Sequence, residues 1–111
     1  ELLPVVAEQI VRKTFRSSFD ETNLAEILAA GDIGRLFICG AETNFCIRST
    51  SYGALERGYD ITLISDSHTA WDGSGDDIPA SVVIAEQNRS FDGYQLSGRS
   101  ASIAKATEVT F

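Results

Sequence analysis

Three residues whose side chains could do chemistry follow segments that predict β-strands: Lys13, Cys46 and Asp66. Lys13 ends a short β-branched run, Cys46 comes shortly after a longer apolar run, and Asp66 follows a third run of β-forming residues. Active sites of open parallel sheets gather at the carboxyl ends of the strands, so these side chains are candidates for a common site.

Cys46 has the most specific setting of the three, because it falls in the first turn of a predicted helix. Unpaired N–H groups and the positive end of the helix dipole stabilise a thiolate there, and a nearby lysine ammonium would favour it further. The same N–H groups could hold an oxyanion formed by attack on a carbonyl. A free cysteine is also often buried as a small hydrophobe, so spacing alone leaves both a nucleophile and a core residue open. Cys39, inside the preceding apolar run, is expected in the core of its strand.

The elements that would position these residues alternate between short strands and helices. The predicted order is a strand at 10–13, a helix that Thr22 caps and Gly31 ends, a strand at 35–39, a helix from about Phe45 to Gly58, a strand at 61–64, a helix from Pro79 towards Phe91, and a strand at 108–111. Glycine just past a helix and proline at its start are the expected boundary residues. The alternation is typical of an α/β fold with a mainly parallel sheet.

The composition bounds the class of protein. The chain has 111 residues, enough for one domain, 1–111, and too few for two. It carries 16 acidic and 9 basic side chains and a net charge of −7, which argues against nucleic acid or an anionic membrane as partner. No apolar run approaches a membrane span, and the N-terminus lacks a signal-peptide pattern. With 2 cysteines we expect a reducing compartment, the cytoplasm. The sequence has no methionine even at position 1, as expected of a chain processed, trimmed or recorded without its start.

Residues 40–72, GAETNFCIRSTSYGALERGYDITLISDSHTAWD, closely resemble the signature of the isochorismatase-like cysteine hydrolases. The matching positions are Gly40, Thr43, Asn44 and Cys46 in the turn, Gly58, Tyr59 and Asp60 before the next strand, and Asp66 and Ser67 at its end. Upstream, residues 13–19 (KTFRSSF) resemble the lysine motif of that family, and residues 84–88 resemble a helix near its C-terminus. The resemblance covers essentially the whole chain, with the motifs in family order.

The resemblance implies a three-layer α-β-α sandwich and a hydrolase that cleaves a C–N amide bond of a small molecule through a covalent cysteine intermediate. It assigns the nucleophile to Cys46, a catalytic lysine to Lys13, and an oxyanion hole to the backbone N–H groups of Glu42 and Cys46. Family members hold the turn with a non-proline cis peptide bond, which here would join Ala41 and Glu42. The thiol favours the amide-hydrolysing branch over the isochorismatases proper, and no cofactor is implied.

One member of the family's catalytic triad has no counterpart in this sequence. The resemblance places a general-base aspartate on a first strand, before the lysine motif, and that strand would precede Glu1; Asp20 and Asp66 match other positions. We therefore expect an N-terminally incomplete domain whose sheet has a gap. The gap would be filled by the protein's own N-terminal segment or by a strand from another copy in a homo-oligomer. A different interpretation stays open: a catalytically incomplete homologue or fragment that serves as a structural or assembly subunit.

Four further side chains are candidates for lining a pocket: Phe19, Asn44, His68 and Trp71. Isolated aromatic residues usually belong to a core or an interface, and the single histidine also fits a structural role in a loop. One histidine cannot supply the aspartate and two histidines with which nicotinamidases of this family bind a metal, so we expect no catalytic metal. The acidic stretch 72–77 lacks the spacing of a calcium loop and predicts a solvated turn.

Overall fold

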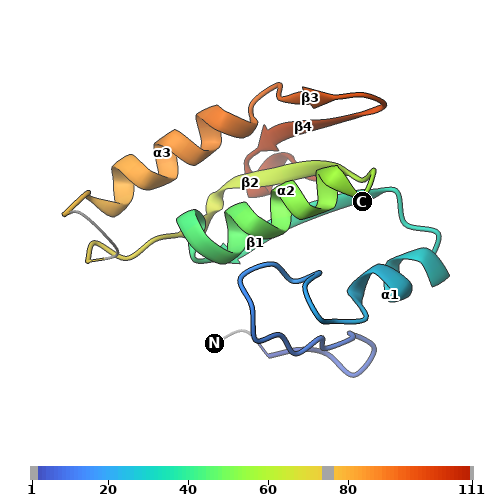
Figure 1. The fold of residues 1–111 in the computed structure, drawn as a ribbon. Helices are drawn as coiled ribbons and strands as arrows, with labels where there is room; N and C mark the ends of the chain where they lie inside the picture. Colours follow the sequence, from blue (N-terminus) through green and yellow to red (C-terminus); the bar gives the residue numbers. More distant parts are fainter. Residues whose placement is uncertain (1–2, 74–76, 111) are drawn as a thin grey trace.

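A computed structural model describes residues 3–73 and 77–110 of the chain (Figure 1). The elements follow in this order: α1 (Leu24–Ala30), β1 (Arg35–Ala41), η1 (Thr43–Ile47), α2 (Arg48–Glu56), β2 (Asp60–Thr69), α3 (Ala80–Phe91), β3 (Gln95–Leu96), β4 (Arg99–Ala104) and η2 (Ala106–Glu108). The element η1 is a π-helical turn and η2 is a short 3-10 helix.

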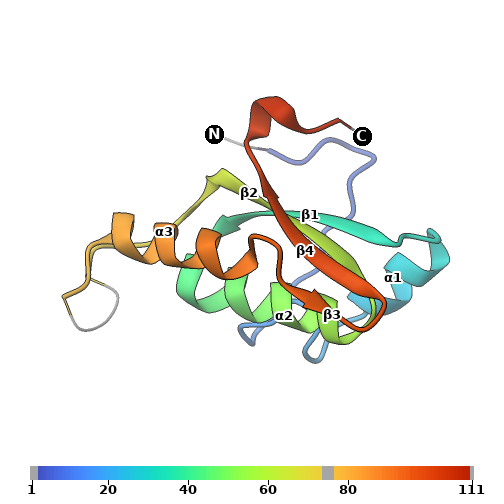
Figure 2. The same ribbon diagram turned by 90° about the horizontal axis from the view of Figure 1, so that it is seen from above.

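The strands form one 4-stranded sheet in the order β1-β2-β4-β3. β1 runs parallel to β2 and β2 runs parallel to β4, whereas β3 and β4 make an antiparallel hairpin. Figure 2 shows α2 and α3 together on one side of this sheet. The expected α/β class with a mainly parallel sheet is confirmed.

The hydrophobic core lies between the sheet and the helices α2 and α3. Ile38 of β1 pairs with Leu63 of β2, and both point to the face that Leu55 of α2 and Phe91 of α3 cover. Leu55, Leu63 and Phe91 are completely buried. Burying one such side chain stabilises the fold by about 1.5–3 kcal/mol, so this layer fixes the position of the two helices on the sheet.

The chain leaves α2 through a glycine turn that leads directly into β2. Gly58 has a φ of +96°, a left-handed conformation that glycine adopts without a steric penalty. The amide of Gly58 donates to the Leu55 carbonyl and the amide of Tyr59 donates to the Ala54 carbonyl, the two bonds of a Schellman motif. The expected helix end at Gly58 is thus confirmed, and it sets the register with which β2 begins.

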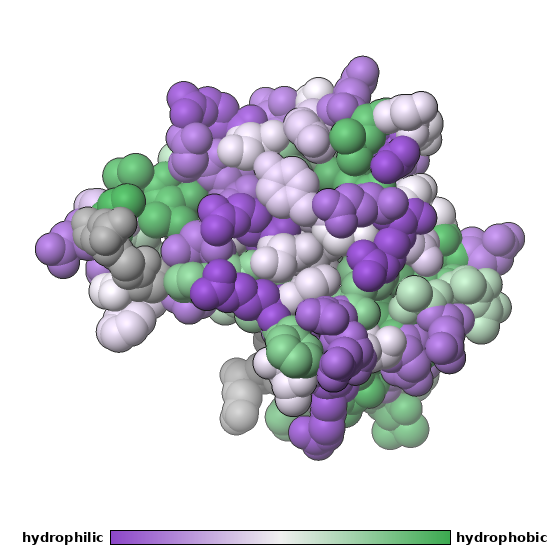
Figure 3. All heavy atoms as spheres, viewed as in Figure 1, coloured by the Kyte–Doolittle hydropathy of each residue, from purple (hydrophilic) through white to green (hydrophobic). Residues whose placement is uncertain are grey.

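Hydrophilic side chains cover most of the face seen in Figure 3, and apolar side chains gather at its left end, over the start of α3. Ile78 and Val82 in that region are half exposed.

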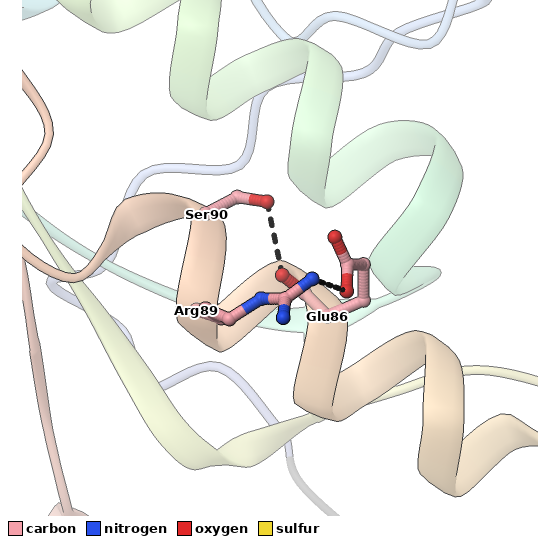
Figure 4. A network of polar contacts seen from close by, with 3 residues as sticks. All are labelled: Glu86, Arg89 and Ser90. Carbon is pink, nitrogen blue, oxygen red and sulfur yellow. Dashed lines mark hydrogen bonds and ion pairs between the residues drawn. The ribbon is translucent and has the colours of Figure 1, made fainter.

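Figure 4 shows a group of polar side chains on α3. Arg89 donates to the Glu86 carboxylate, and the Ser90 hydroxyl donates to the Glu86 carbonyl. The hydrogen bond to the Glu86 carboxylate is the main cause that raises the pKa of Arg89, and the negative charge of Glu86 is the second. Because arginine is already charged at ordinary pH, the raised pKa does not change the charge of Arg89 there.

Two predicted strands are wrong. Residues 10–13 have no regular secondary structure, and η2 occupies part of the segment 108–111, of which Phe111 lies outside the described residues. β-forming residues become a strand only where a neighbouring strand supplies the hydrogen bonds. At 10–13 the chain instead turns towards η1, and near the C-terminus the Asp66 carboxylate accepts from the Ala106 amide and starts the 3-10 turn.

The last two strands were not predictable from a hydrophobic pattern, because β4 has the sequence RSASIA. Its position comes from tertiary contacts: Ala101 pairs with Ile61, and the Ser100 amide donates to the Asp60 carboxylate over 2.8 Å. Gly98, with a φ of +80°, turns the chain from β3 into β4. The hairpin therefore depends on β2 rather than on its own propensity.

The boundaries of the helices differ slightly from those predicted. Asn23, not Thr22, is the N-cap of α1, although the Thr22 hydroxyl accepts from the Leu24 amide; Gly31 ends the helix as expected. Pro79 precedes the first residue of α3, also as expected. The acidic stretch 72–77 lies partly outside the described residues. Within the described part of the chain, each helix is too short or too polar to cross a membrane.

Candidate active site

The structure brings Lys13 and Cys46 into direct contact, 33 residues apart in the sequence. The Lys13 ammonium lies 3.1 Å from the Cys46 sulfur and also donates to the Phe15 carbonyl over 2.9 Å. Lys13 is exposed, whereas Cys46 is half-buried in η1, at the carboxyl end of β1. A cation at this distance stabilises a thiolate relative to a thiol, so the pair has the arrangement of an activated nucleophile.

The segment that carries Lys13 is held against η1 and α2 by two contacts. The Arg16 guanidinium lies 4.5 Å from the centre of the Phe45 ring, the residue just before Cys46. Two residues further on, the Ser18 amide donates to the Thr50 hydroxyl over 2.9 Å. These contacts hold the irregular segment against η1 and α2 shortly after Lys13. Spacing does not reveal them; the only sequence signals are an arginine shortly after the lysine and an aromatic residue beside the cysteine.

The turn between β1 and Cys46 has an unusual backbone. Gly40 has a φ of +117°, and the peptide bond between Ala41 and Glu42 is cis. The Glu42 carbonyl then accepts from the amides of Phe45 and Ile47, over 3.1 and 3.0 Å. These bonds close a turn around Cys46 and direct the chain into α2. Glu42 and Cys46, whose amides are the candidate oxyanion donors, thus belong to one short hydrogen-bonded unit.

The side chains of Glu42 and Asn44, which precede Cys46 in the sequence, are half-buried. Glu42 Oε1 and Asn44 Oδ1 are both buried and lack a hydrogen-bond partner among the described residues. Asn44 also lines a cavity of about 270 Å³ together with Arg48 and residues of α3. Asn44, one of the four pocket candidates, therefore lies in the wall of a cavity.

The other three pocket candidates lie in different environments. Phe19 is 5% exposed and belongs to the core, where it stacks on Tyr59 with the Arg57 guanidinium over its ring. Trp71 is 69% exposed. His68 is buried and bonds to side chains of η1 and α3.

Cys39 and Asp66 do not join the lysine–cysteine pair. The expectation that Cys39 lies in the strand core is wrong: it is exposed, because it points to the sheet face opposite to Ile38. It lines an apolar cavity of about 380 Å³ with Ile64 and Val109, among others. Asp66 is bonded to the start of η2. Over the described residues, no cluster of three or more histidine, cysteine or acidic side chains could hold a metal ion.

The fold and the site together define a class of α/β proteins. In this class a cysteine lies in a tight turn at the end of a parallel strand, and a lysine contacts its sulfur. The chain belongs to the isochorismatase family, because residues 1–79 match the isochorismatase domain. The resemblance seen in the sequence motifs is thereby confirmed.

A curated relative agrees with this assignment. The chain is 32% identical over 106 residues to a streptothricin hydrolase from Streptomyces noursei, an alignment that covers 96% of this chain and 35% of the relative. This chain thus spans about a third of the length of that protein.

Solved structures of the family share the fold. An isochorismatase from Pseudomonas putida superposes with a TM-score of 0.84 at 23% identity, covering 97% of this chain and 54% of the other. An N-carbamoylsarcosine amidase from Thermoplasma acidophilum gives a TM-score of 0.71 at 23% identity, with coverages of 97% and 54%. At this identity the two structures establish the architecture alone.

Proposed function

We propose that this protein hydrolyses a C–N amide bond in a small molecule, with Cys46 as the covalent nucleophile. The observation that carries the proposal is the 3.1 Å contact between the Lys13 ammonium and the Cys46 sulfur. It is supported by a relative named as a streptothricin hydrolase.

In the proposed reaction, the Cys46 thiolate attacks the amide carbon, and the carbonyl oxygen becomes an oxyanion. The backbone N–H groups of Glu42 and Cys46 donate to that oxyanion, and Lys13 stabilises the thiolate before attack. Collapse of the intermediate breaks the C–N bond, and the proton that left the thiol goes to the departing amine. Water then attacks the thioester, which releases the carboxylic acid and restores the thiol.

We propose that the group which shuttles these protons is an aspartate on a further strand of the same protein, added at β1. β1 is one of the two outer strands of the sheet that the described residues form, and the solved relatives are about twice as long as this chain. Exposed apolar side chains that such a segment could cover include Val6 and Ile10. Cys39 of β1 is exposed as well and lines an apolar cavity. A structure of the full-length protein tests this: we expect a strand paired with β1 and a carboxylate beside Lys13. An outer β1 in the complete protein would refute it.

The function itself is tested by release of amine or ammonia from a panel that includes streptothricin, N-carbamoylsarcosine and simple aliphatic amides, with the full-length protein. We expect Cys46→Ala to lower kcat at least about a thousandfold, as the loss of a covalent nucleophile does. Cys39→Ala is the matched control and should keep activity. Full hydrolysis by the Cys46 variant would refute the proposed nucleophile. Absence of hydrolysis with every amide would favour the rival function, a structural or assembly subunit.

A further inference from the structure

A buried chain of polar groups joins the turn that carries Cys46 to β2 and α3. His68, on β2, is 5% exposed, and its Nδ1 lies 2.8 Å from the hydroxyl of Thr43 in η1. Its Nε2 lies 2.8 Å from Asn88 Oδ1 on α3. The Asn88 amide nitrogen donates in turn to the Ser65 carbonyl of β2 over 3.0 Å. The proposed hydrolysis uses none of these four residues.

The Ser65 carbonyl, at the end of these linked hydrogen bonds, fixes the direction of each of them. A carbonyl oxygen only accepts, so the Asn88 amide group must point its nitrogen at Ser65 and its oxygen at His68. The proton of the imidazole therefore lies on Nε2, which donates to Asn88. Nδ1 is then an acceptor in the neutral ring, and the Thr43 hydroxyl donates to it.

Thr43 is well placed to transmit this bond to the nucleophile. It is fully buried, it is the first residue of η1, and it directly follows Glu42, whose carbonyl closes the turn. The backbone of β1 just before the turn, at Gly40, is paired with His68 itself, after a register shift in the two strands. His68 thus contacts the turn from both its backbone and its side chain.

We propose that His68 is a positioning residue for Cys46: through the Thr43 hydroxyl it fixes the η1 turn, and with it the sulfur relative to Lys13 and to the neighbouring amides. The proposal rests on the proposed function in one respect, the role of Cys46 as a reactive thiol. It gives the protein's single histidine a role that acts through another residue and needs no contact with substrate.

The test compares Thr43→Val with Thr62→Val. Thr62 is also buried, lies on β2, and bonds through its hydroxyl to the Ser102 hydroxyl over 3.0 Å, away from the turn. Valine keeps the shape of threonine and removes only the hydroxyl. The readouts are the rate of Cys46 alkylation by iodoacetamide, followed by peptide mapping at fixed pH, and the thermal midpoint, both on the full-length protein.

We expect both variants to lower the thermal midpoint by a similar amount and only Thr43→Val to slow alkylation of Cys46, about threefold or more. Thr43→Ser, which keeps the hydroxyl, should restore the rate. His68→Leu should slow alkylation as well, and the double variant with Thr43→Val should be no slower than either single one, because both remove the same bond. If His68→Leu fails to fold, the threonine series still decides.

Equal rates in Thr43→Val and the unsubstituted protein would overturn the positioning role while leaving the proposed function intact. Equal slowing in both valine variants would overturn it as well, because the effect would then follow stability alone. If Cys46 of the unsubstituted protein reacts no faster than Cys39, the nucleophile itself is wrong and both proposals fail.

Discussion

Removal of the Lys13 charge by Lys13→Met tests the central contact of the site. At the observed 3.1 Å between ammonium and sulfur, two unit charges attract by about 5 kcal/mol at an effective dielectric constant of about 20 and by about 1.3 kcal/mol in bulk water. Because Lys13 is exposed and Cys46 is only half-buried, a value near that of water applies, about 1.5 kcal/mol of attraction between the ammonium and a negatively charged sulfur.

The alkylation rate should change by less than the roughly tenfold that this attraction alone would give. A thiolate that is less stabilised is also a better nucleophile, which returns roughly a factor of three. We therefore expect Lys13→Met to slow the reaction of Cys46 with iodoacetamide by about threefold to fivefold at neutral pH. Cys39, which is exposed on the sheet face opposite to Ile38, serves as the reference thiol within the same molecule.

Two variants control for charge. Lys13→Arg keeps a cation and should retain most of the rate, and Lys105→Met removes the other lysine of the sequence at an exposed position away from this contact. An unchanged Cys46 rate in Lys13→Met, or equal slowing of Cys39, would refute the argument that this ammonium activates this thiol.

Three further predictions follow from the turn and from the segment that holds Lys13. Gly40→Ala forces a side chain into a φ of +117° although its Cβ meets nothing closer than 3.7 Å; we expect a loss of about 1–2 kcal/mol of folding free energy in denaturant titrations, from the backbone alone. The imidazole ¹⁵N signals of His68, the single histidine of these 111 residues, should show the proton on Nε2; a proton on Nδ1 would contradict the derived hydrogen-bond directions. Thr50→Val leaves the Ser18 amide without its acceptor and should cost about 1–2 kcal/mol of stability while slowing Cys46 alkylation; a stable variant with a normal rate would show that this contact does not hold Lys13 in place.

The elements that the sequence predicts correctly are those with their own local signals. The apolar run in β1, the glycine after α2 and the proline before α3 each act through nearby residues, so a sequence pattern suffices. β4 and the run at 10–13 show the opposite case. Ser-Ala-Ser becomes a strand because Ile61 and the Asp60 carboxylate hold it, whereas a β-branched run with no neighbour to pair with stays irregular.

The candidate site likewise combines features that the sequence predicts with features that depend on tertiary contacts. Cys46 is recognisable from its motif, but the motif does not say that its sulfur touches Lys13; that contact depends on Arg16 packing over Phe45 and on Ser18 bonding to Thr50. The burial of Phe19 could not be read from its motif either, because its ring packs between Tyr59 and Arg57, distant in sequence. The proposed nucleophile is thus encoded locally, by a turn that only a few residue types can form. The contact between Lys13 and Cys46 depends on tertiary contacts, and substitutions at Thr43 and Thr50, on either side of Cys46 in the sequence, should therefore change the reactivity of its thiol without altering the cysteine itself.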